Sequence, residues 1–482
     1  MRSDTSVDTQ KWGWALKLFG HHVEPHAVAY AGLDALLFFL PLAWISFPHV
    51  FATGEVALEP YQAVAIALGL LLLTISLGVY NSDAARDVGT YLKRFLVSWE
   101  FIAAAALLFV ALGGFAAVGR HGLSPLLLGA TAALVMSVQV GLRLILGWWL
   151  GRPSHKRRVL ILGDAADSEK VRDFLRGPGR DRFEHLTTLE SWAPDLQPTR
   201  MGNVLLADPS ARALSLSELA ENLKSDEIVV TCEDRGALPV DELLECKLRG
   251  IRVIGALDFW EREAGVVEVA RGAGAWLALS EGLILRPARR RAKRVIDVVI
   301  SLALLLVAAP LCLLVALAIS LDSRGPVFYR QERVGLNGAI FKAWKFRSMR
   351  VDAESDGAPR WAGSRDDRVT RVGRFIRKVR IDEIPQVLNV LAGEMSFIGP
   401  RPERPFFVEQ LRKQIPYYDL RHRVPPGITG WAQVNYPYGA TVEDARRKLA
   451  YDLYYLKRSD LVLDLVILLQ TVRVVLFAHG GR

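Results

Sequence analysis

An acidic doublet, Asp382-Glu383, stands between basic residues in a chain of 482 residues, and this pattern suits chemistry on phosphate. Arg377 precedes the doublet, and Arg401 follows it within the stretch GPRPE. Phosphoryl transfer needs positive groups on the non-bridging oxygens, an aligned nucleophile and usually Mg²⁺. A carboxylate can attack phosphorus, and a neighbouring acid can hold Mg²⁺ through oxygen. A plainer interpretation is that the doublet begins a helix, whose positive N-terminal end favours acids.

Four short motifs follow one another around the doublet. They are KFRSM at 345–349, DEIPQ at 382–386, SFIGPRPE at 396–403 and PGITGWAQV at 426–434. This ordered set resembles the bacterial sugar transferase family, the polyprenyl-phosphate hexose-1-phosphate transferases (monotopic phosphoglycosyl transferases) that begin exopolysaccharide and O-antigen assembly. The resemblance covers the chain from Arg289 onward in detail. The whole chain resembles the large, exopolysaccharide-type members in its architecture.

The resemblance implies a role for each candidate residue. Asp382 is expected to be the nucleophile, and Asp382 and Glu383 together are expected to bind Mg²⁺ and position the reacting groups. Arg401 matches the family's phosphate-binding arginine, and a guanidinium suits bidentate contact with oxyanions. Three further basic residues are weaker candidates for the same role: Arg377, Lys345 and Arg347. An alternative for these three is that they form ordinary surface salt bridges.

The implied reaction has two steps. Asp382 attacks the sugar-linked phosphate of a UDP-hexose, releases UMP and holds the phosphosugar as an aspartyl intermediate. Undecaprenyl phosphate then attacks and becomes undecaprenyl-diphospho-hexose, the first membrane step of exopolysaccharide assembly. The resemblance of GWAQVNYPYGATVEDA to exopolysaccharide-type members favours UDP-glucose or UDP-galactose without naming the sugar. The expected partners are a UDP-hexose, undecaprenyl phosphate and the lipid bilayer, and a homodimer is a further possibility.

Membrane segments are among the elements that must position these residues. A mean hydropathy of +0.21 with 51% hydrophobic residues is too apolar for an ordinary soluble protein, and 23% charged residues is too many for a fully embedded one. Each of four apolar segments is near the roughly 20 residues that a helix needs to cross a bilayer. They predict a four-helix transmembrane bundle within residues 27–150: 27–48, 61–80, 96–118 and 124–150. The alternative is a buried helical core.

The orientation of this bundle follows from Lys and Arg in its short loops. They concentrate in 81–95 and 151–158, and the positive-inside rule then places both ends of the bundle in the cytoplasm. Residues 1–26 lack the shape of a signal peptide. They are expected to be a cytosolic segment, because they precede a bundle whose two ends are predicted to be cytoplasmic. The protein is therefore expected in the bacterial inner (cytoplasmic) membrane as a multi-pass protein with a cytoplasmic catalytic domain.

Residues 156–282 alternate strand-like and helical runs, which predicts a parallel-sheet, Rossmann-like cytosolic domain. RRVLILGDA is typical of a buried strand entering a turn, and NVLLADP, DEIVVTC and GIRVIGA are typical of further strands. The first turn lacks the GxGxxG glycines that let a backbone approach a pyrophosphate. We therefore expect a degenerate domain with a regulatory or structural role, as larger members of the resembled family have.

The segment 289–321 combines a basic run with mostly apolar residues interrupted by Pro310. Composition alone predicts a fifth membrane crossing. Basic residues flank both ends, however, and a crossing would remove the basic domain from cytosolic nucleotide sugars. Pro310 removes a helical hydrogen bond, which would let the segment turn back within one leaflet. The resembled family has such a re-entrant helix, with a break at a proline that matches Pro310.

The catalytic domain is expected over residues 322–482 as a mixed, mostly helical fold that ends in an amphipathic helix at 459–480. It carries 28 Lys and Arg against 18 Asp and Glu, a net charge of +10, whereas the whole chain carries +9. Such a basic excess attracts anionic lipid, a polyprenyl phosphate or a nucleotide diphosphate. Nucleic acid would also be attracted, but no nucleic-acid module is recognisable, and we expect no nucleic-acid partner.

Two other functions stay open from the sequence. A membrane-tethered nucleotide-sugar dehydratase or epimerase would account for four helices followed by a Rossmann-like region. It needs a Tyr-xxx-Lys pair, and the stretch YYLK at 454–457 does not have that spacing. A non-catalytic assembly protein would account for the size of the 156–282 region.

Overall fold

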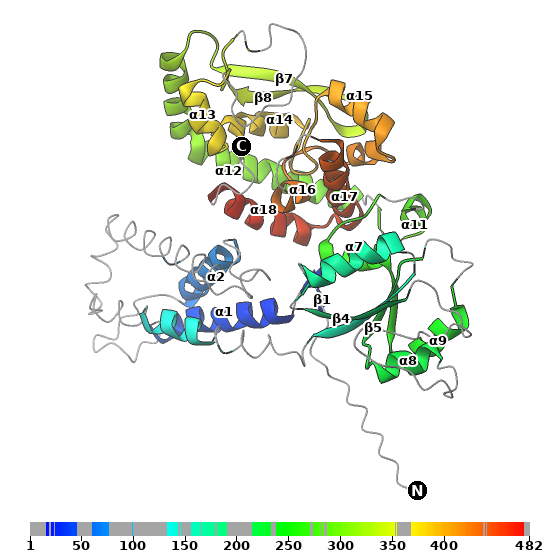
Figure 1. The fold of residues 1–482 in the computed structure, drawn as a ribbon. Helices are drawn as coiled ribbons and strands as arrows, with labels where there is room; N and C mark the ends of the chain where they lie inside the picture. Colours follow the sequence, from blue (N-terminus) through cyan, green and yellow to red (C-terminus); the bar gives the residue numbers. More distant parts are fainter. Residues whose placement is uncertain are drawn as a thin grey trace. The chain divides into compact units, whose positions relative to one another are not determined.

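The computed structural model describes the chain in separate stretches (Figure 1). The described residues are 16–18, 21–23, 25–45, 60–76, 99, 133–142, 145, 156–163, 165–177, 179–180, 182–189, 215–232, 238–269, 273–280, 282–283, 287–351, 353, 368–436, 439 and 441–476. Two compact units make up most of the chain, the first ending at Glu263 and the second beginning at Ala264.

Short strands and apolar helices come first along the chain. They are β1 (Leu16–Leu18), β2 (His21–Val23), α1 (Pro25–Ile45) and α2 (Pro60–Ser76). α1 and α2 pack against each other, and a further helical stretch covers 133–142. Three of the four predicted membrane segments therefore contain helix, 27–48, 61–80 and 124–150, while 96–118 lies outside the described residues except for Trp99. The four-helix bundle as a whole stays a prediction.

A four-stranded parallel sheet follows, in the spatial order β4-β3-β5-β6. Its strands alternate with helices along the chain: β3 (Arg157–Leu162), α7 (Ala165–Arg176), β4 (Phe183–Leu189), α8 (Leu216–Asn222), β5 (Glu227–Val230), α9 (Val240–Leu248), β6 (Arg252–Gly255) and α10 (Ala256–Ala264). The predicted alternation is present, although the run NVLLADP lies outside the described residues. The sequence did not indicate β4, because its stretch FEHLTTL mixes polar and apolar residues. The Rossmann-like assignment stays a prediction.

The side chains of β3 alternate between two apolar clusters, one on each face of this sheet. Leu160 and Leu162 join a cluster with residues of α8 and α9, and Val159 and Ile161 join a cluster with residues of α7 and α10. Figure 1 shows α7 on one side of the sheet and α8 and α9 on the other. Because helices cover both faces, every residue in the centre of β3 is apolar.

α12 (Pro287–Asp322) is the longest helix of the second unit. Among the described residues it is the one helix long and apolar enough to cross a membrane, and shorter apolar stretches lie at 30–40, 133–142 and 461–472. The backbone stays helical through Pro310, so the expected interruption of helical backbone at this residue is absent. A proline removes one hydrogen bond and crowds the preceding turn, which can bend a helix without ending it. The re-entrant path stays a prediction.

Both halves of α12 pack against the domain that follows it. In the first half, the Asp297 carboxylate accepts a hydrogen bond from the Phe397 backbone N–H at 2.9 Å. At the other end, the Asp322 carboxylate accepts one from the Val372 backbone N–H at 3.2 Å, and apolar residues nearby pack onto α13. The two ends of the helix are thus tied to one folded domain.

Small sheets and short helices make up the rest of the second unit. β7 (Phe328–Val334) and β8 (Ile340–Phe346) form an antiparallel hairpin, and β9 (Ser396–Ile398) pairs in parallel with β10 (Gly427–Thr429). The helical elements are α11 (Ala273–Leu279), η5 (Leu336–Gly338), α13 (Arg371–Lys378), η6 (Ile381–Gln386), α14 (Val387–Ala392), α15 (Pro405–Gln414), η7 (Tyr418–Arg423), α16 (Trp431–Asn435), α17 (Val442–Arg458) and α18 (Leu461–Leu476). The mixed, mostly helical fold agrees with the prediction.

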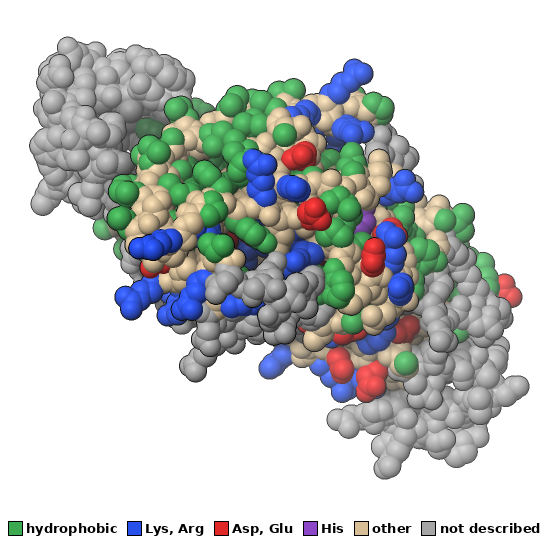
Figure 2. Space-filling model, turned by 90° about the horizontal axis from the view of Figure 1, so that it is seen from above, with side chains coloured by type: hydrophobic (Ala, Val, Ile, Leu, Met, Phe, Trp, Pro, Cys, Tyr) green, Lys and Arg blue, Asp and Glu red, His purple; other side chains and the backbone are tan. Residues whose placement is uncertain are grey.

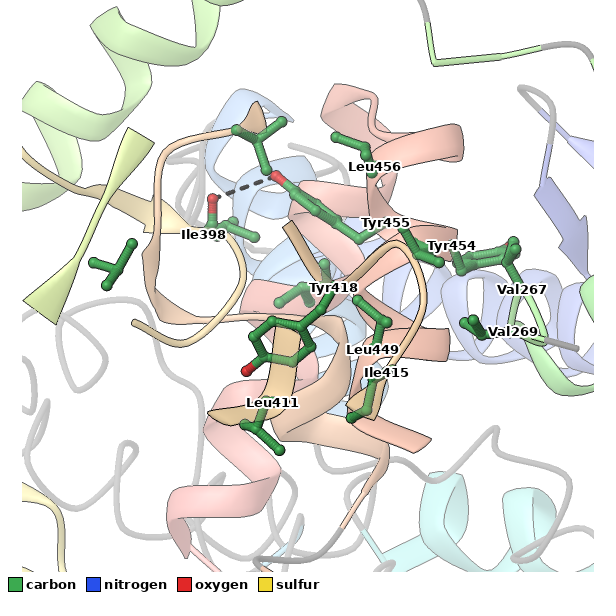
Figure 3. Packing of buried hydrophobic residues seen from close by; sticks show 14 of the residues in the cluster. Val267, Val269, Ile398, Leu411, Ile415, Tyr418, Leu449, Tyr454, Tyr455 and Leu456 are labelled. Carbon is green, nitrogen blue, oxygen red and sulfur yellow. Dashed lines mark hydrogen bonds between the residues drawn. The ribbon is translucent and has the colours of Figure 1, made fainter. Parts of the chain in front are cut away.

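The core of this unit gathers around α17 and α18 (Figure 3). Tyr455 of α17 is buried, and its hydroxyl lies 3.3 Å from the Ile398 carbonyl oxygen and 2.8 Å from an oxygen of Asp464. On α18, Ile467 is buried whereas Leu465 is exposed. α18 therefore packs one face into the domain, as expected of an amphipathic helix.

Candidate active site

The acidic doublet lies on η6, directly before α14. Arg380, the residue before η6, has a left-handed backbone with φ of 60°, and it turns the chain from α13 into η6. Asp382 and Glu383 stand in the first turn and are 9% and 7% exposed. The doublet does begin a helical stretch, so a helix start and a chemical site coincide here.

Three basic side chains surround the Glu383 carboxylate. Lys345 Nζ lies 2.9 Å from Oε1, and Arg401 places Nη2 at 2.7 Å from Oε1 and Nη1 at 3.2 Å from Oε2. Arg380 lies 3.8 Å from Oε2. Burial would raise the pKa of Glu383, but Arg401 and Lys345 outweigh burial and hold this pKa well below its ordinary value. Glu383 is therefore a fixed negative charge that pairs with several cationic side chains.

The Asp382 carboxylate has a different environment. No described residue donates a hydrogen bond to it, although the side chain is largely buried. Burial, and then the charge of Glu383, raise the pKa of Asp382 to about 6 against the attraction of nearby cations. Those cations are Lys345, Arg377 and Arg401. A carboxylate with free oxygens in a positive surrounding is suited to attack on phosphorus.

Two of the predicted phosphate-binding residues meet at Glu383 from distant parts of the sequence. Lys345 comes from β8, and Arg401 follows β9. Arg377, near the end of α13, acts on the other acid, because its charge lowers the pKa of Asp382. These three side chains therefore surround one doublet. For Lys345, a largely buried ion pair with Glu383 takes the place of the surface salt bridge that was the alternative.

Arg347 lies apart from this group. It is 6% exposed, and its Nη2 donates to the backbone oxygen and the hydroxyl of Ser323 at 2.7 and 3.0 Å. Ser323 directly follows α12, and the Arg347 backbone N–H donates to the Val327 carbonyl at 2.8 Å. These contacts favour a structural role for Arg347 at the end of α12. Phosphate binding by Arg347 stays a prediction.

The loop that carries Arg401 is fixed by the pairing of β9 with β10. The Gly427 backbone N–H donates to the Pro400 carbonyl oxygen at 2.9 Å. A Cβ atom at Gly427 would lie 2.1 Å from the Gly399 nitrogen, so only glycine allows the two backbones to approach this closely. The PGITG motif thus supports the GPRPE motif through backbone contact.

Two basic residues of this region were not indicated by the sequence as part of the site. Arg333 and Arg421 contact the backbone of the GPRPE loop. Arg421 is 20 residues from Arg401 in the sequence. Spacing gives no signal for such contacts, because they depend on how η7 and β7 pack against the loop.

The two carboxylates are the candidate ligands for Mg²⁺. Where the structure describes the chain, no three or more His, Cys, Asp or Glu side chains form a group that could hold a metal. Mg²⁺ commonly uses one or two carboxylates together with substrate phosphates, and it keeps several waters. Asp382 offers carboxylate oxygens with no hydrogen-bond donor among the described residues, and Glu383 would exchange one of its cationic contacts for the metal. The donor set therefore fits Mg²⁺ when substrate phosphates complete it.

Comparison with known proteins places the sequence of the second unit in a family. The sequence model of the family described as "Bacterial sugar transferase" matches residues 288–478. The exopolysaccharide production protein PSS of Rhizobium leguminosarum bv. phaseoli is 42% identical over 188 residues, which are 37% of this chain and 92% of that protein. The chain belongs to the bacterial sugar transferase family. The family expected from the four motifs is thereby confirmed.

Longer members of the sugar transferase family match a smaller share of their own length. The UDP-N-acetylgalactosamine-undecaprenyl-phosphate N-acetylgalactosaminephosphotransferase of Aeromonas hydrophila is 47% identical over 190 residues, 39% of this chain and 45% of that protein. The undecaprenyl-phosphate glucose phosphotransferase of Komagataeibacter xylinus is 47% identical over 194 residues, 39% of this chain and 36% of that protein. The chain thus matches less than half the length of these two relatives.

Proposed function

We propose that this chain transfers a hexose-1-phosphate from a UDP-hexose to undecaprenyl phosphate and releases UMP. The observation that carries the proposal is the contrast within the doublet: Glu383 is clamped by Lys345 and Arg401, and Asp382 beside it has no donor among the described residues. Two relatives carry undecaprenyl phosphate in their names, which supports the lipid acceptor. Their names differ in the sugar that is transferred. The sugar that this chain transfers must therefore be identified by testing a panel of donors.

In the first step, the diphosphate of the UDP-hexose binds among the basic side chains. Arg401 and Lys345 contact its non-bridging oxygens, and Arg377 adds positive charge beside Asp382. An oxygen of ionised Asp382 attacks the phosphorus that carries the sugar. The bond from this phosphorus to the bridging oxygen breaks, and UMP leaves with that oxygen and the electron pair. The sugar phosphate stays on Asp382 as an acyl phosphate.

In the second step, a phosphate oxygen of undecaprenyl phosphate attacks the same phosphorus. The bond to Asp382 breaks, the carboxylate is regenerated, and the product is undecaprenyl-diphospho-hexose. Each step exchanges one phosphorus–oxygen bond for another, so neither an oxidant nor a reductant is needed. Glu383 positions Arg401 and Lys345, and it would exchange one of these two contacts when Mg²⁺ binds. Mg²⁺ held by Asp382 and Glu383 would offset the negative charge of the diphosphate.

The same proposal includes the membrane layout. Residues 1–26 and the catalytic domain at 322–482 lie in the cytoplasm, four helices within 27–150 cross the inner membrane, and 156–282 form a degenerate Rossmann-like domain. The segment 289–321 enters and leaves one leaflet. The packing of both ends of α12 against one domain supports this path, because a crossing helix would carry its ends to opposite sides.

The outer side chains of α12 support contact with lipid. Large apolar residues along it are exposed: Val295, Ile296, Val299, Leu302, Leu306, Val307, Leu311, Leu313, Leu314, Leu317 and Leu321. On the face seen in Figure 2, apolar side chains gather in places beside Lys and Arg side chains. An apolar surface with a basic margin suits the boundary between acyl chains and anionic headgroups, where the lipid substrate presents its phosphate.

The dehydratase alternative gains no support from the tyrosines of α17. Tyr454 and Tyr455 are 7% and 2% exposed, and the Tyr455 hydroxyl contacts Asp464 inside the domain. A tyrosine that acts on a nucleotide sugar must instead reach the substrate. We therefore retain one proposed function.

A panel of donors tests the proposal. Full-length protein in nanodiscs, with Mg²⁺ and undecaprenyl phosphate, is incubated separately with UDP-glucose, UDP-galactose, UDP-N-acetylglucosamine and UDP-N-acetylgalactosamine. At least one donor should give UMP and lipid-linked diphosphosugar in equal amounts. Release of UDP in place of UMP, or no product from any donor, would contradict the proposal.

A further inference from the structure

The backbone around Arg401 is held through its carbonyl groups. Pro400 and Pro402 flank Arg401 and have no N–H, so the segment cannot be fixed through donors at these two positions. The Pro400 carbonyl accepts a hydrogen bond from the Gly427 N–H at 2.9 Å. The next two carbonyls accept from side chains instead.

Two arginines supply these donors. Arg421 Nη2 donates to the Arg401 carbonyl oxygen at 3.0 Å, and Arg333 Nη1 donates to the Pro402 carbonyl oxygen at 2.9 Å. The side chains of Arg421 and Arg333 are only 5% and 14% exposed. Hydrogen bonds from a charged donor are shorter and stronger than neutral ones, so these contacts fix the loop more firmly than a neutral side chain would.

The guanidinium of Arg421 also has partners at its remaining nitrogen atoms. Its Nε and Nη2 lie 2.9 and 2.8 Å from Asp452 Oδ2, and its Nη1 donates to the Tyr418 hydroxyl oxygen at 2.9 Å. Asp452 and Tyr418 are 1% and 3% exposed. A planar guanidinium with partners on three sides has a single orientation. The backbone of Arg401 is thus tied to a rigid, buried cluster of the domain.

We propose that Arg421, oriented by Asp452 and Tyr418, is a positioning residue that sets how far Arg401 reaches toward Glu383 and the donor phosphate. The inference rests on the proposed function, because the reach of Arg401 affects turnover only if Arg401 binds that phosphate. The Arg401 guanidinium makes two contacts with Glu383, at 2.7 and 3.2 Å, and a small shift of its backbone would break them. A misplacement of about 1 Å can cost on the order of 100-fold in rate.

A double-mutant cycle on the full-length protein tests this role. Arg421→Lys keeps the charge and can still pair with Asp452, but an ammonium cannot reproduce the fork that reaches three partners. With Arg401 intact, the substitution should lower kcat/KM for UMP release roughly 10- to 100-fold. With Arg401→Lys already present, it should change kcat/KM less than about twofold, since no positioned guanidinium remains. A purely structural residue would lower both by the same factor, and that result would overturn the proposal.

Binding measurements extend the cycle if Arg401→Lys turns over too slowly to assay. UDP is the probe, because it carries the diphosphate shared by all the donors tested. Its Kd, measured by calorimetry in the presence of Mg²⁺, should rise on Arg421→Lys with Arg401 intact and stay unchanged with Arg401→Lys. Equal weakening in both backgrounds would again overturn the proposal.

Two further variants distinguish a loss of activity caused by misfolding from one caused by a displaced Arg401. Arg412→Lys changes an exposed arginine of the same unit that pairs with Asp419 at 2.9 Å, and it should leave kcat/KM unchanged. Tyr418→Phe removes one contact of Arg421 and keeps the ring, and it replaces Arg421→Lys if the latter fails to fold. It should lower kcat/KM roughly threefold, again only with Arg401 intact.

The outcomes also separate this inference from the function on which it rests. A wild-type protein that releases no UMP from any donor contradicts the proposed function. An active wild type with an equally active, folded Arg421→Lys variant contradicts only the positioning role.

Discussion

Buried arginine–carboxylate pairs occur both in the parallel-sheet unit and in the sugar transferase unit, but the two units use them differently. In the sheet unit, Glu227 accepts hydrogen bonds from Arg262 at 2.6 and 2.9 Å. Glu263 in the same unit accepts from three arginines at 2.5 to 3.2 Å. In the transferase unit, Glu383 is paired in the same way, whereas the adjacent Asp382 has no donor among the described residues.

This difference in hydrogen-bond partners distinguishes buried carboxylates that stabilise the fold from a buried carboxylate that can react. A buried carboxylate whose two oxygens are paired with cationic side chains is stabilised as a charge and presents fewer free lone pairs to a substrate. Asp382 has no hydrogen-bond donor among the described residues, and its pKa rises to about 6 because burial and Glu383 disfavour its charge. Perturbed groups of this kind mark functional sites more often than fully paired ones do.

The largest effect is expected from Asp382→Asn, which removes the charge of the acid that no described residue pairs with. The amide has nearly the same shape but cannot attack phosphorus, so kcat for UMP release should fall by at least about 10⁴-fold. Mass spectrometry should find the phosphosugar on the peptide that contains residue 382 in the wild type and not in the variant. An Asp382→Asn protein with more than about a tenth of wild-type activity would remove the nucleophile from the proposal.

The second largest effect is expected on the stability of the sheet unit when the paired acid Glu227 is substituted. Glu227→Gln leaves Arg262 buried without its full partner, and breaking a buried pair costs about 3–5 kcal/mol. Hydrogen exchange of the β3 and β5 amides should become faster by the corresponding factor. Wild-type protection of these amides in the variant would mean that the pair does not stabilise the sheet.

A smaller effect is expected when the pH is changed, because a buried histidine makes the stability of the transferase unit depend on pH. Burial and then Arg421 lower the pKa of His422 to about 4, although Asp419 opposes them. An unfolded histidine has a pKa near 6.5, so between these values the unfolded chain binds more protons than the folded one. The stabilisation is therefore complete above about pH 6.5 and is lost as the pH falls toward 4.

From pH 7 to pH 5, His422 should lower the free energy of unfolding of this unit by about 2 kcal/mol. Urea-dependent pulse proteolysis at both pH values measures this change. The control is His422→Gln, which lacks the titrating group and should lose about 2 kcal/mol less over the same range. Identical pH dependence in the two proteins would show that His422 is not neutral in the folded state.

The smallest effect is expected at an exposed pair of the sheet unit. Arg249 contacts Glu221 at 2.8 Å and Glu245 at 3.0 Å on the surface. Exposed pairs of this kind are screened by water and salt. Arg249→Ala should therefore leave the melting temperature and the exchange of β3 and β5 unchanged, which sharpens the contrast with Glu227→Gln. A clear loss of stability would show that this exposed pair stabilises the sheet unit as much as the buried pairs do.

Much of the fold followed from local patterns in the sequence. The apolar run of β3 and the long apolar stretch of α12 are visible as patterns because each element is apolar along its length. β4 was missed because its polar residues hide the strand. The backbone at Pro310 stays helical because a proline removes only one hydrogen bond and its neighbours continue the helix.

The residues of the candidate site and their roles were predicted from motifs and resemblance, but the contacts between them were not. The motifs brought Lys345, Arg401 and the doublet into one site, and the structure places Lys345 and Arg401 in contact with Glu383. Arg347, two residues after Lys345, has other partners, because β8 ends at Phe346 and the chain turns toward the end of α12. The resemblance named Asp382 as the nucleophile, but only the folded surroundings show that Glu383 is paired with Lys345 and Arg401 while Asp382 has no donor among the described residues.

The sequence by itself determined the family and the residue types of the site, since ordered motifs and charge are properties of the chain. The tertiary structure alone decided which charges meet. Glu383 pairs with Lys345 and Arg401 across 38 and 18 residues, and Arg421 reaches the Arg401 backbone across 20. Such contacts depend on how separate elements pack, and packing also decides that, among the described residues, Glu383 has cationic partners and Asp382 has no donor.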